Sequence, residues 1–279
     1  MWVKVFLFII LLLSILISLA GLNVIKRKHR LIWGKIWKIE SDIETITDDI
    51  TEIKKELILL KEPKGRLNHI MPSQYGEDVY LWNHFKRRSG FFIEIGAYDG
   101  VTFSNTYWLE HVGWTGILVE PNPELYKKCL KARPFSKVIH AAITGDESLD
   151  SVTLVLPDNI GGRDALAYTV KSDYQVNRVN DTGVKLRHIQ VPAMTTKRLL
   201  RDVTENIDVL SIDVEGAEME VLKTFDFNRF RPEIIIIEDN LRGKDKTIYE
   251  FMHSKNYTVN KIISRNIIFI PCISDTDIQ

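Results

Sequence analysis

Three short apolar segments, each ending in a carboxylate, constrain the fold of this chain more than any other feature. They are FFIEIGAYDG at residues 91–100, ILVEPNP at 117–123 and VLSIDVEGAE at 209–218. In open α/β sheets, ligands bind beyond the carboxyl ends of the strands. Three acidic strand ends, with a glycine turn after the first, therefore indicate a nucleotide-type pocket.

Strand and helix patterns alternate from residue 73 onward, which predicts right-handed crossovers and a mainly parallel sheet. Only a few residues separate the last two strands, so they form a hairpin and one of them runs antiparallel. We expect an α/β, Rossmann-like domain at residues 70–279 with a seven-stranded, mostly parallel sheet. The expected strands lie near 91–95, 116–119, 137–140, 208–212, 233–238, 257–263 and 266–271, and the helices near 76–88, 103–111, 122–132, 197–203, 216–224 and 244–255.

The first two strand ends carry groups that suit a particular ligand. Glycine at 96 and 100 lets the backbone approach a ligand closely, although an ordinary strand-to-helix turn also explains this spacing. Glu94 would repel a pyrophosphate but suits the ammonium of an amino-acid ligand, which favours S-adenosylmethionine over NAD. Glu120 ends the next strand, where a carboxylate accepts hydrogen bonds from two ribose hydroxyls.

The third strand end is more acidic still. The negative charges of Asp213, Glu215 and Glu218 repel one another, which suggests that the charge has a function. The candidates are a general base for a hydroxyl, a divalent cation, or contact with the sulfonium of a methyl donor; the sequence holds no further support for a cation, and we assign no metal ligand. Glu218 has a structural alternative, because an acid stabilises a helix N-terminus. Glu238 and Asp239 end another central strand and face the same edge.

Five motifs resemble the FkbM-type family of class I, S-adenosylmethionine-dependent methyltransferases, over about residues 70–271. They are SQYGED at 73–78, EIGAYDG at 94–100, SNT at 104–106, EPNP at 120–123 and DVEGAE at 213–218. The resemblance implies methyl transfer to an oxygen of a sugar or small hydroxylated metabolite, with Glu94 and Gly96 at the methionine part of the cofactor and Glu120 at its ribose. Asp213, Glu215 and Glu218, at the acidic third strand end, are the catalytic candidates. Tyr98 replaces the asparagine common after Gly-Ala in the family. The expected cofactor-binding residues are Gln74, Glu94, Gly96, Ala97, Gly100, Ser104, Asn105, Thr106, Glu120 and Pro121.

The N-terminal segment has the composition of a membrane anchor. Residues 5–22 are almost wholly apolar, and at ~1.5 Å per residue such a run crosses a ~30 Å hydrocarbon core. We expect a transmembrane anchor at residues 1–25; a signal peptide cleaved near Ala20 is the alternative. The basic cluster at 26–30 places the rest of this single-pass protein in the cytosol, whereas two glycosylation sequons, at Asn180 and Asn256, leave an ER or Golgi luminal orientation open.

A heptad pattern follows at residues 31–62. Isoleucine or leucine recurs at alternating spacings of four and three from Ile32 to Leu60, which predicts a coiled coil. Isoleucine at both a and d positions favours trimers or larger parallel assemblies. The alternative is an amphipathic helix that packs on its own domain.

Composition excludes several other functions. Lysine plus arginine equals aspartate plus glutamate, at 37 each, so no overall field favours nucleic acid. Cys129 and Cys272 have neither metal-ligand spacing nor the pattern of a disulfide framework.

The long segment at 151–196 is a candidate substrate lid. It carries five residues that suit an anionic or sugar ligand or are simply solvated: Arg163, Tyr168, Lys171, Arg178 and Arg187.

These observations predict a membrane-anchored, self-associating O-methyltransferase for a sugar, glycan or small metabolite. Two alternatives stay open. One is a catalytically inactive scaffold or trafficking protein that retains the fold, and the other is an NAD-dependent dehydrogenase, which Glu94 and the terminal hairpin disfavour.

Overall fold

The computed structural model describes residues 71–86, 89–157, 167, 169 and 185–272, together with five residues between 35 and 46. The predicted anchor at 1–25 and most of the heptad segment lie outside this part of the chain. Among the described residues, no helix has the length and apolar character needed to cross a membrane. The chain divides into two compact units, Met1–Ile53 and Lys54–Gln279.

In the first unit the described residues are helical and exposed. Three of them are isoleucines of the heptad pattern: Ile39 and Ile43 are each 57% exposed and Ile46 is 56% exposed. The coiled coil itself stays a prediction.

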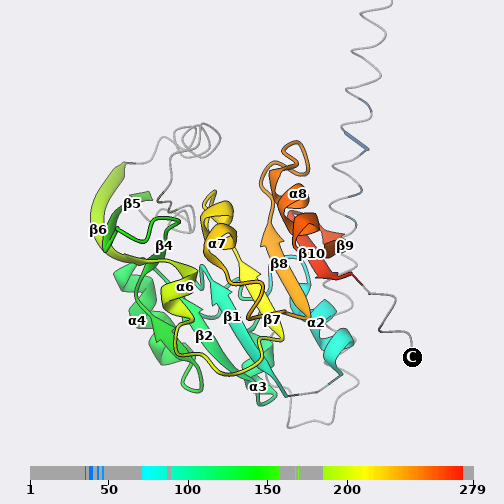
Figure 1. The fold of residues 1–279 in the computed structure, drawn as a ribbon, viewed down its shortest axis with the longest axis horizontal. Coiled ribbons are helices and arrows are strands. Elements are labelled where there is room, and N and C mark those ends of the chain that lie inside the picture. The colour runs from blue at the N-terminus through cyan, green and yellow to red at the C-terminus, as the bar shows by residue number, and fades with distance from the viewer. Residues whose placement is uncertain are drawn as a thin grey trace, which may run out of the picture. The chain divides into compact units, whose positions relative to one another are not determined.

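The second unit is built around a seven-stranded sheet (Figure 1). Its order is β3-β2-β1-β7-β8-β10-β9. The strands pair in parallel from β3 to β8, whereas β10 runs antiparallel to both β8 and β9. The seven predicted strands and the terminal hairpin are thus confirmed. The strands are β1 (Phe91–Ile95), β2 (Thr115–Val119), β3 (Lys137–Ile139), β7 (Val209–Ile212), β8 (Ile234–Glu238), β9 (Tyr257–Ile263) and β10 (Asn266–Pro271).

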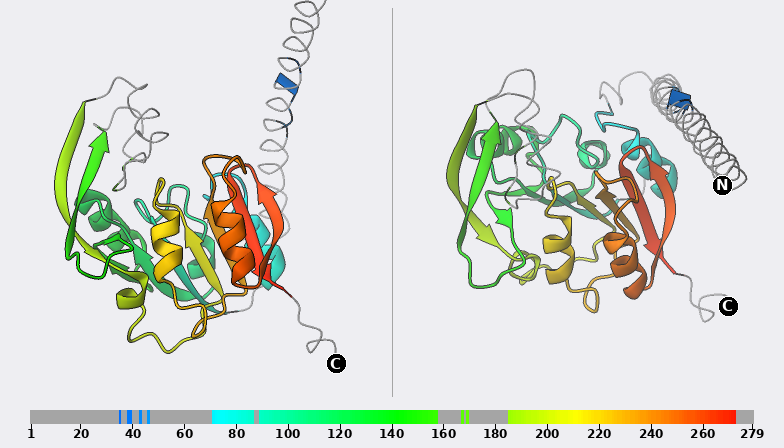
Figure 2. Two further views of the ribbon diagram at one scale, coloured as in Figure 1. Left: turned by 45° about the horizontal axis from the view of Figure 1, so that its top comes forward. Right: turned by 90° about the horizontal axis from the view of Figure 1, so that it is seen from above.

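Helices cover both faces of this sheet, as the two further views show (Figure 2). Successive side chains of a strand point to opposite faces, so the apolar runs fill two cores. Ile93 and Ile95 pack in one core with residues of α6, α7 and α8, and Phe92 packs in the other with residues of α2, α3 and α4. The helices are α2 (Glu77–Phe85), α3 (Tyr107–His111), α4 (Pro123–Ala132), α6 (Thr196–Leu199), α7 (Glu218–Thr224) and α8 (Thr247–Ser254).

α3 and α7 begin later than the sequence predicts, and in both a left-handed turn precedes the helix. α3 begins at Tyr107 rather than near 103, because Phe103 has a φ of +63°. α7 begins at Glu218 rather than at 216, because Glu215 and Gly216 have φ values of +51° and +100°. Both left-handed turns lie at the carboxyl edge of the sheet and shape its loops.

The segment predicted as a lid, residues 151–196, contributes two of the three strands of a second, smaller sheet. β4 (Ala142–Ile143), β5 (Ser151–Pro157) and β6 (Leu186–Met194) pair in the order β4-β6-β5. Leu154, Leu156, Val191 and Ala142 form its own apolar core. Of residues 158–184, which join β5 to β6, only Ala167 and Thr169 are described.

Candidate active site

A cavity of about 320 Å³ lies at the carboxyl ends of β1, β2, β7 and β8, a size typical of small-molecule sites. Ten of the thirteen predicted site residues line it. They are Gln74, Glu94, Gly96, Ala97, Ser104, Asn105, Glu120, Pro121, Asp213 and Glu215. Gly100, Thr106 and Glu218 are not among its lining residues.

Gly96 brings the β1 turn against the end of β7. Its φ is +91°, and a Cβ added there would lie 1.6 Å from the carbonyl oxygen of Asp213. Only glycine fits this approach. The turn is held on its other side because the amides of Gly96 and Ala97 donate to the carbonyl of Val119, at 2.9 and 3.1 Å. The glycine therefore unites three strand ends around one cavity.

Glu120 is a buried carboxylate that the backbone holds in place. The amide of Tyr98 donates to its Oε2 at 2.9 Å, and the amide of Asn122 donates to its Oε1 at 2.8 Å. Tyr98 has a φ of +53°, an uncommon conformation for a bulky residue. The turn after β1 thus presents a backbone donor to the acid at the end of β2.

Glu94 lies in a network centred on Arg133, which the sequence analysis did not identify. The hydroxyls of Ser104 and Thr106 donate to Glu94 Oε2 at 2.8 and 2.7 Å, and the amide of Asn105 donates to Oε1 at 2.9 Å. Arg133 is fully buried and also donates to Glu94 Oε2, at 3.4 Å. The negative charge of Glu94 is therefore largely compensated within the protein.

Arg133 has further partners around the same turn. Its Nε donates to Glu110 Oε2 at 2.9 Å, and its Nη atoms donate to the carbonyls of Gly100 and Thr106 at 3.2 and 3.3 Å. Gly100 packs closely here, since an added Cβ would lie 2.9 Å from Arg133 Cγ. Gly100 and Thr106 thus help to hold the turn after β1 through Arg133, although neither residue lines the cavity.

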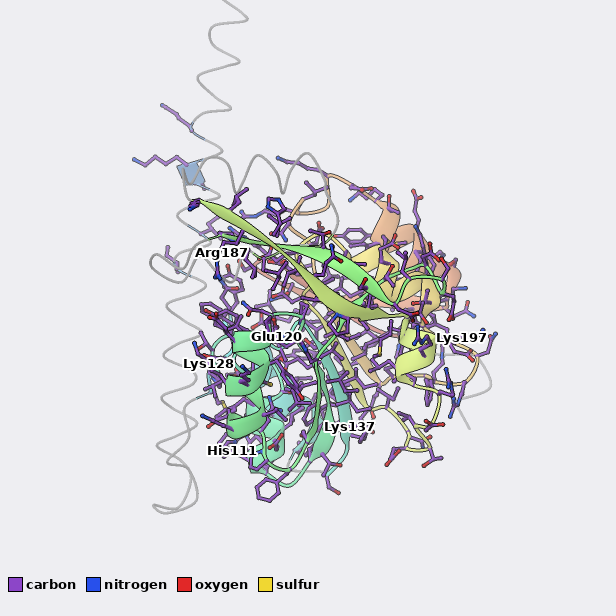
Figure 3. All side chains as sticks on the ribbon, turned by 90° about the vertical axis from the view of Figure 1, so that its left-hand side faces the viewer. His111, Glu120, Lys128, Lys137, Arg187 and Lys197 are labelled. Carbon is purple, nitrogen blue, oxygen red and sulfur yellow. The ribbon has the colours of Figure 1, made fainter. Side chains whose placement is uncertain are left out.

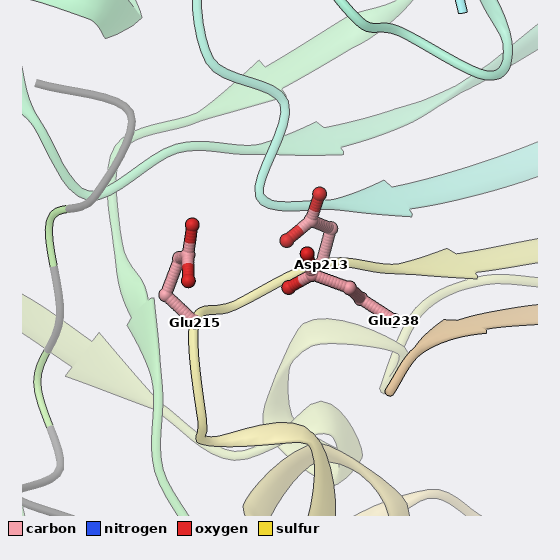
Figure 4. A group of neighbouring side chains, drawn as sticks. All are labelled: Asp213, Glu215 and Glu238. Atoms are coloured by element: carbon pink, nitrogen blue, oxygen red, sulfur yellow. The ribbon is translucent and has the colours of Figure 1, made fainter. Parts of the chain in front are cut away.

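Three carboxylates meet beyond β7 and β8 (Figure 4). Asp213, Glu215 and Glu238 each place one oxygen within 4.8 Å of the others. Burial, followed by repulsion from Glu238 and Glu215, raises the pKa of Asp213 well above its ordinary value. The oxygens of these three carboxyl groups are also the ligands that a divalent cation prefers. These three residues would hold a cation if one binds.

Glu218 lies in the first turn of α7 and its carboxylate is turned to the backbone. The amide of Gly216 donates to its Oε1 at 2.9 Å. Burial raises its pKa to about 7. Its position matches the structural alternative, an acid at a helix N-terminus.

Asp239 and Arg187 lie where they cannot line the main cavity. Asp239 accepts hydrogen bonds from the amide of Leu241 at 3.0 Å and the hydroxyl of Tyr249 at 3.1 Å, so it shapes the loop after β8. Arg187 lies near one end of β6 (Figure 3) and borders a smaller cleft with Lys128 of α4. The other four residues predicted as ligand groups in this segment lie outside the described residues.

The charges of the cavity fit a cationic methyl donor. The described lining contains five carboxylates, from Glu94, Glu120, Asp213, Glu215 and Glu238, and one guanidinium, from Arg265. Apolar side chains of Leu125, Ala141 and Ile143 line it as well. A sulfonium and an ammonium gain from such surroundings, and an adenine gains from the apolar surface.

The sheet order and this cavity define a Rossmann-like methyltransferase domain. The sequence model of the Methyltransferase FkbM domain matches residues 94–259, which is more than half of the chain. The chain therefore belongs to the FkbM methyltransferase family, as its motifs predict, and S-adenosylmethionine is its cofactor.

Several solved structures are similar at low identity. The precorrin-6y C5,15-methyltransferase of Geobacter metallireducens is 12% identical, with a TM-score of 0.40, over 75% of this chain and 90% of that one. A putative RNA methyltransferase of Pyrococcus horikoshii is also 12% identical, with a TM-score of 0.40, over 80% and 96%. Fibrillarin of Aeropyrum pernix, bound to S-adenosyl-L-methionine, is 13% identical, with a TM-score of 0.37, over 66% of both chains. The comparison with curated proteins gave no match.

Proposed function

We propose that this protein is a membrane-anchored O-methyltransferase that methylates a hydroxyl of a sugar, glycan or small metabolite. The observation that carries the proposal is the group formed by Asp213, Glu215 and Glu238 beside the candidate cofactor cavity. S-adenosylmethionine supplies an activated methyl group, so the protein chiefly has to align the acceptor oxygen with it.

In this proposal Asp213 takes the proton of the acceptor hydroxyl. A carboxylate with a raised pKa is a stronger base than an isolated one, and general bases work best when their pKa lies close to the working pH. Asp213 has that raised pKa because it is buried beside Glu238 and Glu215. The two neighbouring acids then share the proton that it receives.

The cofactor-binding role in this proposal falls to Glu120 and to the turn after β1. Glu120 is already fixed by two backbone amides, and a carboxylate oxygen accepts more than one hydrogen bond. It is thus oriented to receive the ribose hydroxyls. Gln74, Ser104 and Asn105 line the same cavity beside Glu94 and Gly96.

The anchor and the oligomer are parts of the proposal that rest on the sequence. The apolar run at 5–22 and the basic cluster after it favour a cytosolic catalytic domain on a single-pass anchor. The exposure of Ile39, Ile43 and Ile46 supports a parallel coiled coil of three or more chains, because exposed isoleucines at heptad positions gain from a partner helix. Cofactor, acceptor and membrane are then the partners, without nucleic acid.

Two substitutions in the full chain test the site. Glu120→Ala should reduce affinity for S-adenosylhomocysteine, measured by calorimetry, by at least ~100-fold, because a buried acceptor of hydrogen bonds is lost. Asp213→Asn should leave that affinity within ~3-fold and lower the rate of methyl transfer by ~100-fold or more. Asp202→Asn, at an exposed acid outside the cavity, is the matched control.

The same measurements separate the alternatives. A scaffold would give no transfer from labelled S-adenosylmethionine to any sugar or metabolite, and a dehydrogenase would bind NAD instead. An unchanged affinity in Glu120→Ala would overturn the assignment of the cofactor site. Chelation with EDTA reports whether the three carboxylates act through a cation.

A further inference from the structure

The turn between β9 and β10 brings an arginine into the candidate active site. Arg265 lines the cavity with Asp213, Glu215 and Glu238. Of the described residues that line this cavity, it alone carries a positively charged side chain. Within the described part of the chain, its guanidinium makes no hydrogen bond or ion pair. An arginine has five N–H donors in a planar fork, so this group is available for a ligand.

The backbone beneath Arg265 is fixed. Its carbonyl accepts a hydrogen bond from the amide of Asp239 at 2.7 Å, which joins the turn to the end of β8. The side chain of the next residue, Asn266, donates to Glu77 Oε1 at 2.6 Å, and both of these residues are buried. The turn is therefore built to hold the base of the arginine in one place.

The order of the strands separates Arg265 from the cofactor end of the cavity. Glu120, Glu94, Asp213, Glu238 and Arg265 follow one another along the sheet edge, at the ends of β2, β1, β7 and β8 and just before β10. Neighbouring strands lie ~4.8 Å apart. By this spacing the strand next to Arg265 is roughly 10 Å from the strand of Asp213 and roughly 19 Å from that of Glu120. Arg265 thus lies beyond the proposed base, on the side away from Glu120.

We propose that Arg265 binds an anionic group of the acceptor, a carboxylate or a phosphate on the same molecule as the hydroxyl that is methylated. A guanidinium binds such groups through two parallel hydrogen bonds. The acceptor class is then an acidic sugar, a sugar phosphate or a hydroxy acid. This inference rests on the proposed function, because it uses Asp213 as the base.

The charge of the cavity indicates which kind of acceptor Arg265 would bind. Five carboxylates already suit a neutral or cationic acceptor, which would need no guanidinium. An anionic acceptor does need one, because the carboxylates at the strand ends would otherwise repel it. The carboxylate of the cofactor's methionine is the second source of the same chemistry, and the experiment must distinguish the two.

The test uses the full chain, saturated with S-adenosylhomocysteine, and pairs of probes that differ in charge. Binding of glucuronate against glucose, and of glucose 6-phosphate against glucose, is followed by ligand-observed NMR and calorimetry. We expect at least one anionic probe to bind ~10-fold or more tightly than glucose. Arg265→Gln should abolish this preference, and Arg265→Lys should restore part of it. Arg201→Gln, at an exposed arginine outside the cavity, should keep it.

Each other outcome overturns the inference. If the anionic probes bind no more tightly than glucose, or if Arg265→Gln keeps the preference, no anion site exists at Arg265. If Arg265→Gln weakens binding of S-adenosylhomocysteine more than ~3-fold while its thermal unfolding is unchanged, the arginine serves the cofactor instead. Failure of the proposed function looks different, because the wild-type chain would then bind no S-adenosylhomocysteine or transfer no methyl group to any hydroxyl.

Discussion

Acidic residues close together in the sequence meet very different surroundings in the fold. In DVEGAE, Asp213 lies beside Glu238, whereas Glu218 accepts a hydrogen bond from the amide of Gly216. Glu94, at the end of β1, has a buried arginine beside it. Carboxylate side chains therefore provide the proposed base, a helix-end group and a structural ion pair, and local surroundings decide between these roles.

The titration of Glu218 leads to a prediction at this scale. Its pKa is about 7 in the folded chain against an ordinary value of 4.5. Between these values the folded state binds more protons than the unfolded state, so the contribution of this residue to stability falls as pH rises from about 4.5 to 7. The total change is about 3 kcal/mol. Glu218→Gln removes this penalty, so the variant should gain stability over wild type at pH 7.5 but not at pH 4.5.

Urea unfolding of both chains at a series of pH values measures this difference. Comparing the two chains cancels the titration of groups that do not interact with Glu218. The charge of Glu218 contributes to the raised pKa of Asp213, so both chains carry Asp213→Asn in this comparison. A difference in stability that stays constant from pH 4.5 to 7.5 would show that Glu218 titrates normally.

At the scale of elements, Arg133 at the end of α4 joins that helix to β1 and to the turn before α3. Arg133→Met removes the cation that compensates Glu94 and Glu110. Removing one partner of a buried ion pair costs about 3–5 kcal/mol. We expect that loss in urea unfolding, together with weaker binding of S-adenosylhomocysteine because the turn after β1 loses its support.

Lys131→Met is the matched control, since this lysine is exposed on the same helix and should change stability by less than ~0.5 kcal/mol. Arg133→Met with wild-type stability would mean that the two buried acids are compensated by protonation or water rather than by the arginine.

The sequence predicts some elements better than others for a physical reason. β1, β7 and β8 are buried on both faces, and such strands form continuous apolar runs. β6 is mixed, since Arg187, His188 and Gln190 are exposed, so its segment resembles a polar loop. The short apolar run of β5, VTLVLP, with two β-branched valines, was the signal that a sequence reading could have used.

At the scale of the whole molecule, one unit carries the cavity and the other carries most of the heptad pattern. Ile43→Asp places a charge at an a position of the predicted coiled coil, where burial of the charge would be costly. The mass of the detergent-solubilised protein, measured by analytical ultracentrifugation, should therefore fall toward that of one chain. Affinity for S-adenosylhomocysteine should stay unchanged.

Lys38→Asp introduces the same charge at an exposed residue outside the a and d positions, and it should preserve the wild-type mass. Equal masses for Ile43→Asp and wild type would contradict self-association through this segment.

The sequence alone was enough to predict the strands, the terminal hairpin, the family and ten of the residues that line the cavity. It could do so because buried strands, glycine turns and acidic strand ends are local patterns. Only the tertiary structure placed Arg133 behind Glu94, brought Glu238 to Asp213 and set Arg265 at the end of the row. These contacts join residues from 25 to more than 50 positions apart, and long-range packing, which leaves no local pattern, decides them.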